Sequence, residues 1–228
     1  MMLRKKIFER FTGRQAIESF ADDDSHYESG QELVRQGRHS EAVAAFKRAS
    51  QTGTDQAESY LALGLAYEHL NRFEEAIQAF SEAIKVKRDF TEGYTRLGLA
   101  YDRSGQFLKA IRMHLSAIRL NPSNVELRKN LGVAYFNVGS YAEAIKALTQ
   151  ALQIDPDDAS VRHCLGLVYL DLEDKDSALQ QHKLIKELGH VDLAANLMDE
   201  IDRQFLRNAG STGKHQTPSD SMAEETTS

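Results

Sequence analysis

The sequence has little of what disulfide-bonded, membrane-spanning or nucleic-acid-binding proteins need. Its 228 residues include a single cysteine, Cys164, so no disulfide can form within the chain, which fits a reducing compartment. No apolar run approaches the roughly 20 residues that cross a membrane as a helix, and the basic first residues contain no continuous apolar segment of a secretory signal. The formal net charge of −6 argues against a general affinity for nucleic acid, because phosphate recognition needs clustered Lys and Arg. We therefore expect a cytoplasmic protein that does not bind nucleic acid.

Features that interrupt helices are also scarce. The chain contains three prolines, and the alternation of apolar and polar residues that is typical of strands is rare. With 41% hydrophobic and 27% charged residues, the composition is that of a chain that buries a core rather than of a disordered one. Together these properties predict an all-α protein.

What the sequence does have is an internal repeat of 34 residues. Each copy contains a glycine, followed at fixed distances by an aromatic or leucine residue, an alanine and a large side chain. The glycines are Gly30, Gly64, Gly98, Gly132 and Gly166, and the large side chains are Phe46, Phe80, His114, Leu148 and His182. Glycine and alanine leave room where two helix backbones approach closely. Each copy is therefore predicted to form a helix, a short turn and a second helix.

The second copy illustrates the predicted hairpin. Its apolar residues have helical spacing over about residues 58–70 and 73–86. Residues that tolerate the left-handed conformation at a helix end stand between the two helices in four copies: Gly37, Asn71, Gly105 and Gly139. The fifth copy has Glu173 at this place, so we expect a looser turn there.

Three pairs of residues have the spacing of a capping box, in which two side chains bind free amides of a helix's first turn. The pairs are Asp55 with Glu58, Asp89 with Glu92, and Ser123 with Glu126. They predict that the first helix of the second, third and fourth copies begins at these pairs.

The pattern L-G-x-x-Y, then A-x-x-x-F-x-x-A, then P resembles the tetratricopeptide repeat. The resemblance covers residues 23–192 in five copies: 23–56, 57–90, 91–124, 125–158 and 159–192. It is strongest in the three middle copies; the first has Ser29 where Leu is usual, and the fifth has His190 in place of Pro. It implies an all-α, right-handed α-solenoid of five helix-turn-helix repeats.

The two ends lie outside the repeats. Residues 193–208 are predicted to form a capping helix over the second helix of the fifth copy, because Leu193, Leu197, Ile201 and Phe205 lie four apart. The polar tail 209–228 is predicted to be disordered. Residues 1–22 form a basic amphipathic extension. It is interpreted as a helix docked on protein, with an anchor on an anionic membrane through residues 1–14, or an import presequence, as alternatives.

The resemblance also implies which residues face the inner groove, namely the second, fifth, ninth, twelfth and thirteenth of each copy. The candidate partner-binding residues are Tyr27, Gln31, Glu58, Leu61, Leu65, Glu68, Glu92, Thr95, Leu99, Asp102, Arg103, Glu126, Lys129, Val133, Phe136, Asn137, His163, Leu167 and Leu170. The same positions also include Val34, Arg35, His69 and Asp171. The ninth residue is aliphatic in four of the five copies. These side chains either form the floor of an open groove or pack against neighbouring helices.

Acidic residues flank that column in the middle copies, which favours an amphipathic, basic partner segment. Some family members clamp a partner's C-terminal carboxylate with Lys and Asn, but Tyr27 and Gln31 stand at those places in the first copy. A co-chaperone role of the Hsp90 or Hsp70 type is therefore disfavoured.

The residues contain no pattern typical of an enzyme. No His pair has metal-ligand spacing within a helix, no phosphate-binding loop occurs, and the adjacent His163 and Cys164 point in different directions on a helix. His114 and His182 occupy a column of Phe or Leu, and a flat ring at the edge of the core is favoured over a pH-sensitive group. We expect no catalytic, cofactor-binding or metal-binding residues.

The sequence thus predicts a non-catalytic scaffold or adaptor that binds a peptide or helix of a partner protein in a concave groove. Two alternatives stay open. One is a peripheral membrane assembly factor anchored by the basic N-terminus. The other is a self-assembling homo-oligomer, in which that segment occupies a neighbour's groove.

Overall fold

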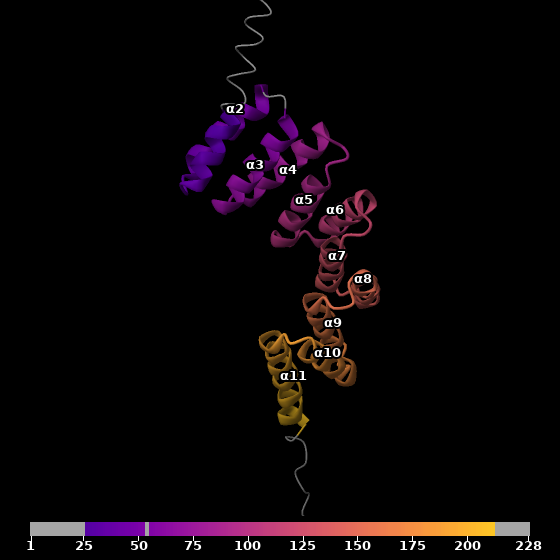
Figure 1. Ribbon diagram of the computed structural model, residues 1–228. Helices are drawn as coiled ribbons and strands as arrows, with labels where there is room; N and C mark the ends of the chain where they lie inside the picture. Colours follow the sequence, from indigo (N-terminus) through magenta and orange to yellow (C-terminus); the bar gives the residue numbers. More distant parts are fainter. Residues whose placement is uncertain (1–25, 53–54, 213–228) are drawn as a thin grey trace, which may run out of the picture. The chain divides into compact units, whose positions relative to one another are not determined.

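The computed structural model describes residues 26–52 and 55–212, and the regular structure within these ranges is entirely helical (Figure 1). Residues 1–22, with their predicted amphipathic extension, lie outside the described residues, as do residues 213–228 of the predicted tail. The all-α prediction is confirmed for the part that is described.

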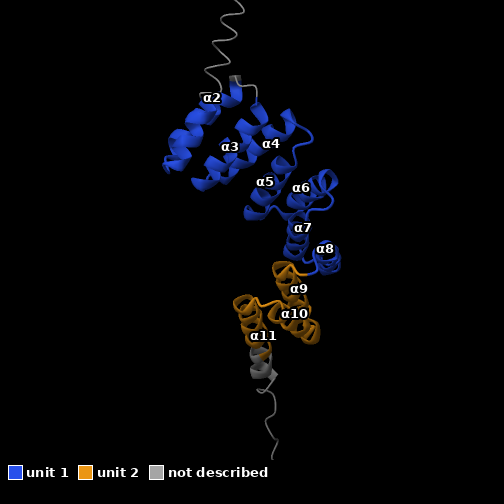
Figure 2. Ribbon diagram, in the orientation of Figure 1, with its two compact units in different colours: residues 1–156 blue, residues 157–228 orange. Residues whose placement is uncertain are grey.

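The chain divides into two compact units, with the boundary after Pro156 (Figure 2). The first unit contains a helix whose described part covers residues 26–35, and then α2 (His39–Thr52), α3 (Gln56–His69), α4 (Phe73–Val86), α5 (Thr91–Arg103), α6 (Phe107–Leu120), α7 (Val125–Asn137) and α8 (Tyr141–Ile154). The second contains α9 (Ala159–Asp171), α10 (Lys175–Glu187) and α11 (Val191–Thr212). Consecutive helices pair as hairpins: 26–35 with α2, α3 with α4, α5 with α6, α7 with α8, and α9 with α10.

Every hairpin turns through one residue in the left-handed region. The φ angles are 73° at Gly37, 56° at Asn71, 71° at Gly105, 74° at Gly139 and 60° at Glu173. The expectation of a looser fifth turn is wrong, because Glu173 N donates to Leu170 O at 2.9 Å and Asp174 N to Tyr169 O at 2.9 Å, as in the other turns. Two hydrogen bonds hold the same turn, although a residue with a side chain pays a conformational penalty there.

The repeated glycine makes room for a side chain rather than for a neighbouring backbone. A Cβ at Gly64 would lie 2.4 Å from Phe80 Cε1, and one at Gly98 would lie 2.5 Å from His114 Cε1. The fifth hairpin differs, since a Cβ at Gly166 would lie 2.6 Å from Leu197 Cδ2 in α11. In the fifth hairpin, the side chain that fills the space beside the glycine therefore comes from α11. In the first four hairpins, it comes from the second helix of the same hairpin.

His114 is enclosed completely, with a relative exposure of 0%, so the prediction that it stands at the core's edge is wrong. Its Nε2 lies 2.8 Å from Asp102 Oδ2, within hydrogen-bond distance, and the Asp102 side chain is itself only 14% exposed. A polar group this deeply buried is tolerated when it has a partner.

The predicted capping boxes are not formed. Asp55 precedes α3 but makes no side-chain cap, α5 begins after Phe90 rather than Asp89, and α7 is capped by Asn124, whose Oδ1 accepts from Leu127 N at 3.2 Å. In the second unit, Asp158 and Asp174 cap α9 and α10 in the same way. The helix following Pro122 starts one residue later than the spacing of Ser123 implies, so the residue next to Ser123 becomes the cap.

The helix α11 extends beyond its predicted range of 193–208 at both ends, and four of the residues assigned to the polar tail are helical. It packs against α9 as well as α10, and not against the second helix of the hairpin alone. Leu197 and Ile201 are fully buried in a cluster with Leu170 and Ile185, and Gln204 Nε2 donates to Leu170 O at 2.8 Å. This helix therefore covers part of the face that the resemblance assigns to the groove.

Candidate partner-binding groove

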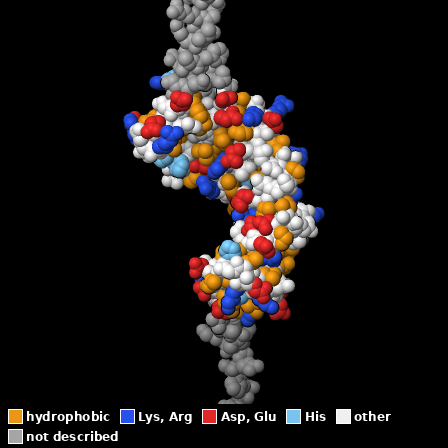
Figure 3. Space-filling model, viewed as in Figure 1, with side chains coloured by type: hydrophobic (Ala, Val, Ile, Leu, Met, Phe, Trp, Pro, Cys, Tyr) orange, Lys and Arg blue, Asp and Glu red, His pale blue; other side chains and the backbone are white. Residues whose placement is uncertain are grey.

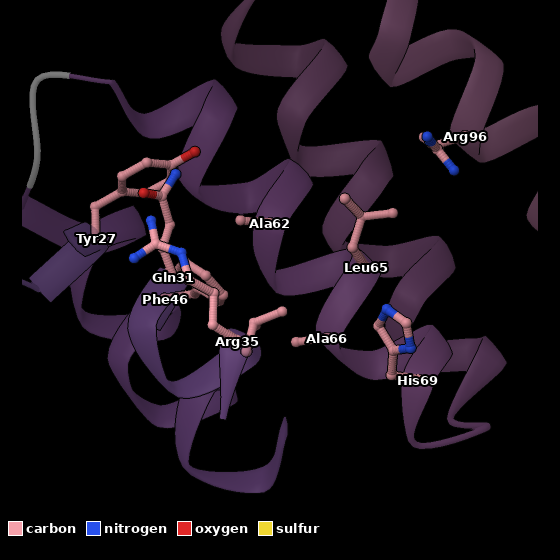
Figure 4. A pocket seen from close by; sticks show the side chains of 10 residues that line it. Tyr27, Gln31, Arg35, Phe46, Ala62, Leu65, Ala66, His69 and Arg96 are labelled. Carbon is pink, nitrogen blue, oxygen red and sulfur yellow. The ribbon is translucent and has the colours of Figure 1, made fainter. Parts of the chain in front are cut away.

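A pocket of about 570 Å³ opens between the first two hairpins (Figure 4). Side chains of the helix 26–35 and of α3 face each other across it, with Phe46 from α2 and Arg96 from α5 completing the wall. The lining residues are Tyr27, Gln31, Val34, Arg35, Phe46, Ala62, Leu65, Ala66, His69 and Arg96. A pocket of this size is in the range that holds a few side chains of a peptide.

Helical spacing brings three side chains of the helix 26–35 to one wall of the pocket. Tyr27, Gln31 and Arg35 follow one another at intervals of four, so they share a face of the helix. Phe46 fills the space left by Gly30, where a Cβ would lie 2.5 Å from its ring, and its ring lies 5.7 Å from that of Tyr27 at 57°. The glycine of the first repeat thus fixes the position of the Phe46 ring, which is 2% exposed at the edge of the pocket.

The opposite wall comes from α3. Leu65 is half-buried against the core that α4 and α5 share, and Ala62 packs against the core of α2 and α3. His69, the last residue of α3, stacks on His39 at the start of α2, with ring centroids 4.4 Å apart and an angle of 11°. The stack holds the exposed imidazole of His69 at the rim.

Within the described ranges, the two arginines that line the pocket form ion pairs with exposed carboxylates. Arg35 Nη1 lies 2.8 Å from Glu32 Oε2, and Arg96 Nε lies 2.7 Å from Glu92 Oε1, with each pair lying along a single helix. The Arg35 and Glu32 side chains are 70% and 53% exposed, and such pairs contribute little because solvent screens them. A hydrogen bond from Gln36, and after it the one from Arg35, lowers the pKa of Glu32.

The acidic residues that flank the ninth position in the middle copies form ion pairs or hydrogen bonds with other side chains of the chain. Asp102 faces His114 in the interior, and Glu68 accepts a 2.8 Å bond from Arg103 with only 9% of its side chain exposed. Three further pairs are Glu58 with Lys87, Glu92 with Arg96, and Glu126 with Lys129. Figure 3 shows acidic and basic side chains interspersed on the visible face of the first unit.

The other groove candidates of the first unit are partly exposed but do not line this pocket. Thr95 Oγ1 donates to Thr91 O at 2.8 Å, and the Phe136 ring lies 6.1 Å from that of Tyr141. Leu61, Thr95, Leu99, Val133 and Phe136 are half-buried, whereas Arg103 and Asn137 are exposed. Of the predicted set, Tyr27, Gln31 and Leu65 are the residues that the pocket brings together.

In the second unit, α11 packs over two of the predicted groove residues, Leu167 and Leu170. Leu170 is buried, with 4% exposure, inside the cluster that contains Leu197, so its assignment to an open groove is wrong. Leu167 packs against the same cluster. His163 is half-buried, and burial lowers its pKa, while the nearby Glu200 of α11 opposes that effect.

Sequence reasoning missed four lining residues. Phe46 belongs to the column of large side chains, which predicts packing within the hairpin, and Ala62 and Ala66 stand at repeat positions to which the resemblance assigns no role in the groove. Arg96 is the sixth residue of its copy and reaches the wall through the length of its side chain. No sequence signal would have identified it.

Within residues 26–52 and 55–212, no group of three or more His, Cys, Asp or Glu side chains gathers as a metal site would require. In the same part of the chain, none of the helices combines the length and apolar character needed to cross a membrane. Cys164 is half-buried and not in a disulfide.

Comparisons with known proteins identify similar chains. Residues 33–225 match the family model described as Cilia and flagella-associated protein 70 C-terminal domain. MamA of MSR-1 is 26% identical with a TM-score of 0.62, covering 74% of this chain and 97% of its own. MamA from Desulfovibrio magneticus RS-1 is 20% identical, with a TM-score of 0.68 and coverages of 74% and 95%. YrrB, a TPR protein with an unusual peptide-binding site, is 20% identical, with a TM-score of 0.65 and coverages of 76% and 90%. No curated protein matches the chain.

Proposed function

This chain belongs to the family of the Cilia and flagella-associated protein 70 C-terminal domain and is an all-α tetratricopeptide-repeat protein, and from that premise we propose that it is a protein-interaction scaffold that binds a peptide segment in the pocket between its first two hairpins. The observation that carries the proposal is the pocket itself. It has an apolar floor of Ala62 and Leu65, behind which the ring of Phe46 is almost fully buried, and the lining also contains polar side chains.

The binding mechanism follows from this arrangement. Helices hold the lining side chains at fixed spacing, so little conformational entropy is lost when a segment binds. An apolar side chain of the partner would displace water from the floor, while Gln31 and Tyr27 would hydrogen-bond to its polar groups. No bond is made or broken in such a process.

Self-assembly through the basic N-terminus has less support. That alternative depended on an acidic groove, and two of the carboxylates expected there, Glu68 and Asp102, are largely buried and paired within the chain, with 9% and 14% of their side chains exposed. Among the ten residues lining the pocket in the described part of the chain, none is Asp or Glu. A membrane anchor through residues 1–14 stays a prediction, since those residues lie outside the described ranges.

The experiment is a peptide-binding screen by fluorescence anisotropy. The affinity of each peptide that binds is then measured for the wild type and for the variants Leu65→Ala and Leu108→Ala. Leu108 is the matched control, because it is 71% exposed on α6 and does not line the pocket. Removing the floor contact should weaken binding roughly tenfold, which corresponds to about 1.4 kcal/mol, and the control should bind as the wild type does. Equal affinity of all three proteins, each with an intact helical spectrum, would reject the pocket as the binding site.

A further inference from the structure

We propose that the pocket selects an acidic segment, in which a carboxylate stands beside an apolar anchor residue. The inference rests on the proposed function and specifies the chemistry of the partner at that same site. The charge that we infer for the partner segment is opposite in sign to that of the basic segment which the sequence favours.

The polar groups of the lining are mainly hydrogen-bond donors. Arg35 and Arg96 bring two guanidinium groups to the lining, and Figure 4 shows that of Arg35 beside Gln31 and Tyr27, with Arg96 on the far side of Leu65. Guanidinium groups donate in a fork that matches a carboxylate. The Tyr27 hydroxyl and the Gln31 amide add neutral donors, so a carboxylate would find several partners at once.

The arginines are able to change partners. Their present partners, Glu32 and Glu92, are not among the residues that line the pocket and are exposed, with 53% and 47% of the side chain accessible. Water weakens such pairs strongly, whereas a carboxylate that enters a partly enclosed pocket is screened less. A basic segment would instead place its charge near two guanidinium groups, with no acidic group in the described lining to compensate.

The apolar floor sets the second requirement. Ala62 and Leu65 offer an apolar surface, while Phe46 and Ala66 are 2% and 1% exposed and add little to it. The volume of about 570 Å³ exceeds what a carboxylate alone fills. An aromatic or aliphatic side chain next to the acidic residue would occupy it. The carboxylate can come from an Asp or Glu side chain or from a chain terminus, and the chemistry is the same.

The test uses Gln31, which lines the pocket one helical turn before Arg35 and is only half-buried, so a change of charge there should leave the fold intact. Gln31→Glu and Gln31→Lys form a matched pair of opposite sign. The probes are fluorescent peptides containing Phe-Asp-Asp, the same peptides with Lys for Asp or Ser for Phe, and each with a free or an amidated C-terminus. Binding is measured at low and high salt.

The amidated Phe-Asp-Asp peptide should bind the full-length protein, with affinity about fivefold lower for Gln31→Glu, about fivefold higher for Gln31→Lys, and reduced by salt. Binding that requires the free C-terminus supports the same chemistry and assigns the carboxylate to a terminus. Binding of the Lys peptides with the opposite order of variants overturns the acidic selectivity and leaves the proposed function standing. If no peptide, including hits of the wider screen, responds to either Gln31 variant, the proposed function itself fails at this pocket.

Discussion

Replacing His114 by Phe tests how the buried polar pair of the third hairpin is held. The chain contains the apolar version of this arrangement, since the first hairpin has Phe46 and Val34 at the corresponding positions. Phe80 fits against Gly64 with the same close geometry that His114 has against Gly98. A phenyl ring therefore fits at position 114, and the variant isolates the loss of the polar contact.

The single change leaves Asp102 without its partner although its side chain is only 14% exposed. Removing one partner of a buried, charge-assisted hydrogen bond costs about 1.5–3 kcal/mol. Asp102→Val leaves a fully buried imidazole with no hydrogen-bond partner, since the His114 Nδ1 has none already, and should cost about 1–3 kcal/mol. The double variant replaces the pair by apolar groups and should lie within about 1 kcal/mol of the wild type.

The assay is a double-mutant cycle by urea unfolding, followed by circular dichroism, with thermal melts as a second readout. Each single variant should lower the Tm by roughly 2–4 °C per kcal/mol lost, and the double should recover most of that loss. If the double variant loses as much stability as the two single variants summed, His114 and Asp102 do not act as a unit.

Three further predictions concern other positions. Glu173→Gly should raise the free energy of unfolding by about 1 kcal/mol in urea titrations, because its φ of 60° costs a side-chain-bearing residue more than glycine. Gly64→Ala should lower the free energy of unfolding by about 1–3 kcal/mol, and with it the Tm, because the added Cβ would lie 2.4 Å from the buried Phe80 ring. An unchanged Tm would contradict this. Burial lowers the pKa of His163, so the folded chain resists protonation and stability should fall as the pH drops below the unfolded value of 6.5. His163→Asn should reduce that loss between about pH 7 and pH 5 in parallel melts.

The fold could be predicted from the sequence because its signals are local and repeated. The helix Phe73–Val86 has the predicted bounds, since apolar spacing and the turn at Asn71 fix both ends. The cap at Asn124 was missed because spacing alone does not decide which of two adjacent polar residues takes the cap position. The turn at Glu173 shows that two backbone hydrogen bonds override a weak conformational preference.

The candidate site could be predicted only in part, because it depends on contacts between hairpins. The family positions led to Tyr27, Gln31 and Leu65, which share one pocket. They also led to Leu170, which α11 buries, and to Asp102, which turns inward to His114. Whether a groove position is open depends on what packs over it, and the repeat pattern carries no information about that.

Binding of a partner polypeptide between the first two hairpins can be tested by photo-crosslinking. A benzophenone side chain is placed at position 31, in the pocket, or at position 108, on the exposed face of α6. A peptide recovered from the binding screen should crosslink at position 31 and leave position 108 unlabelled, with unlabelled peptide competing. Equal labelling at both positions, or labelling at position 108 alone, would contradict the claim.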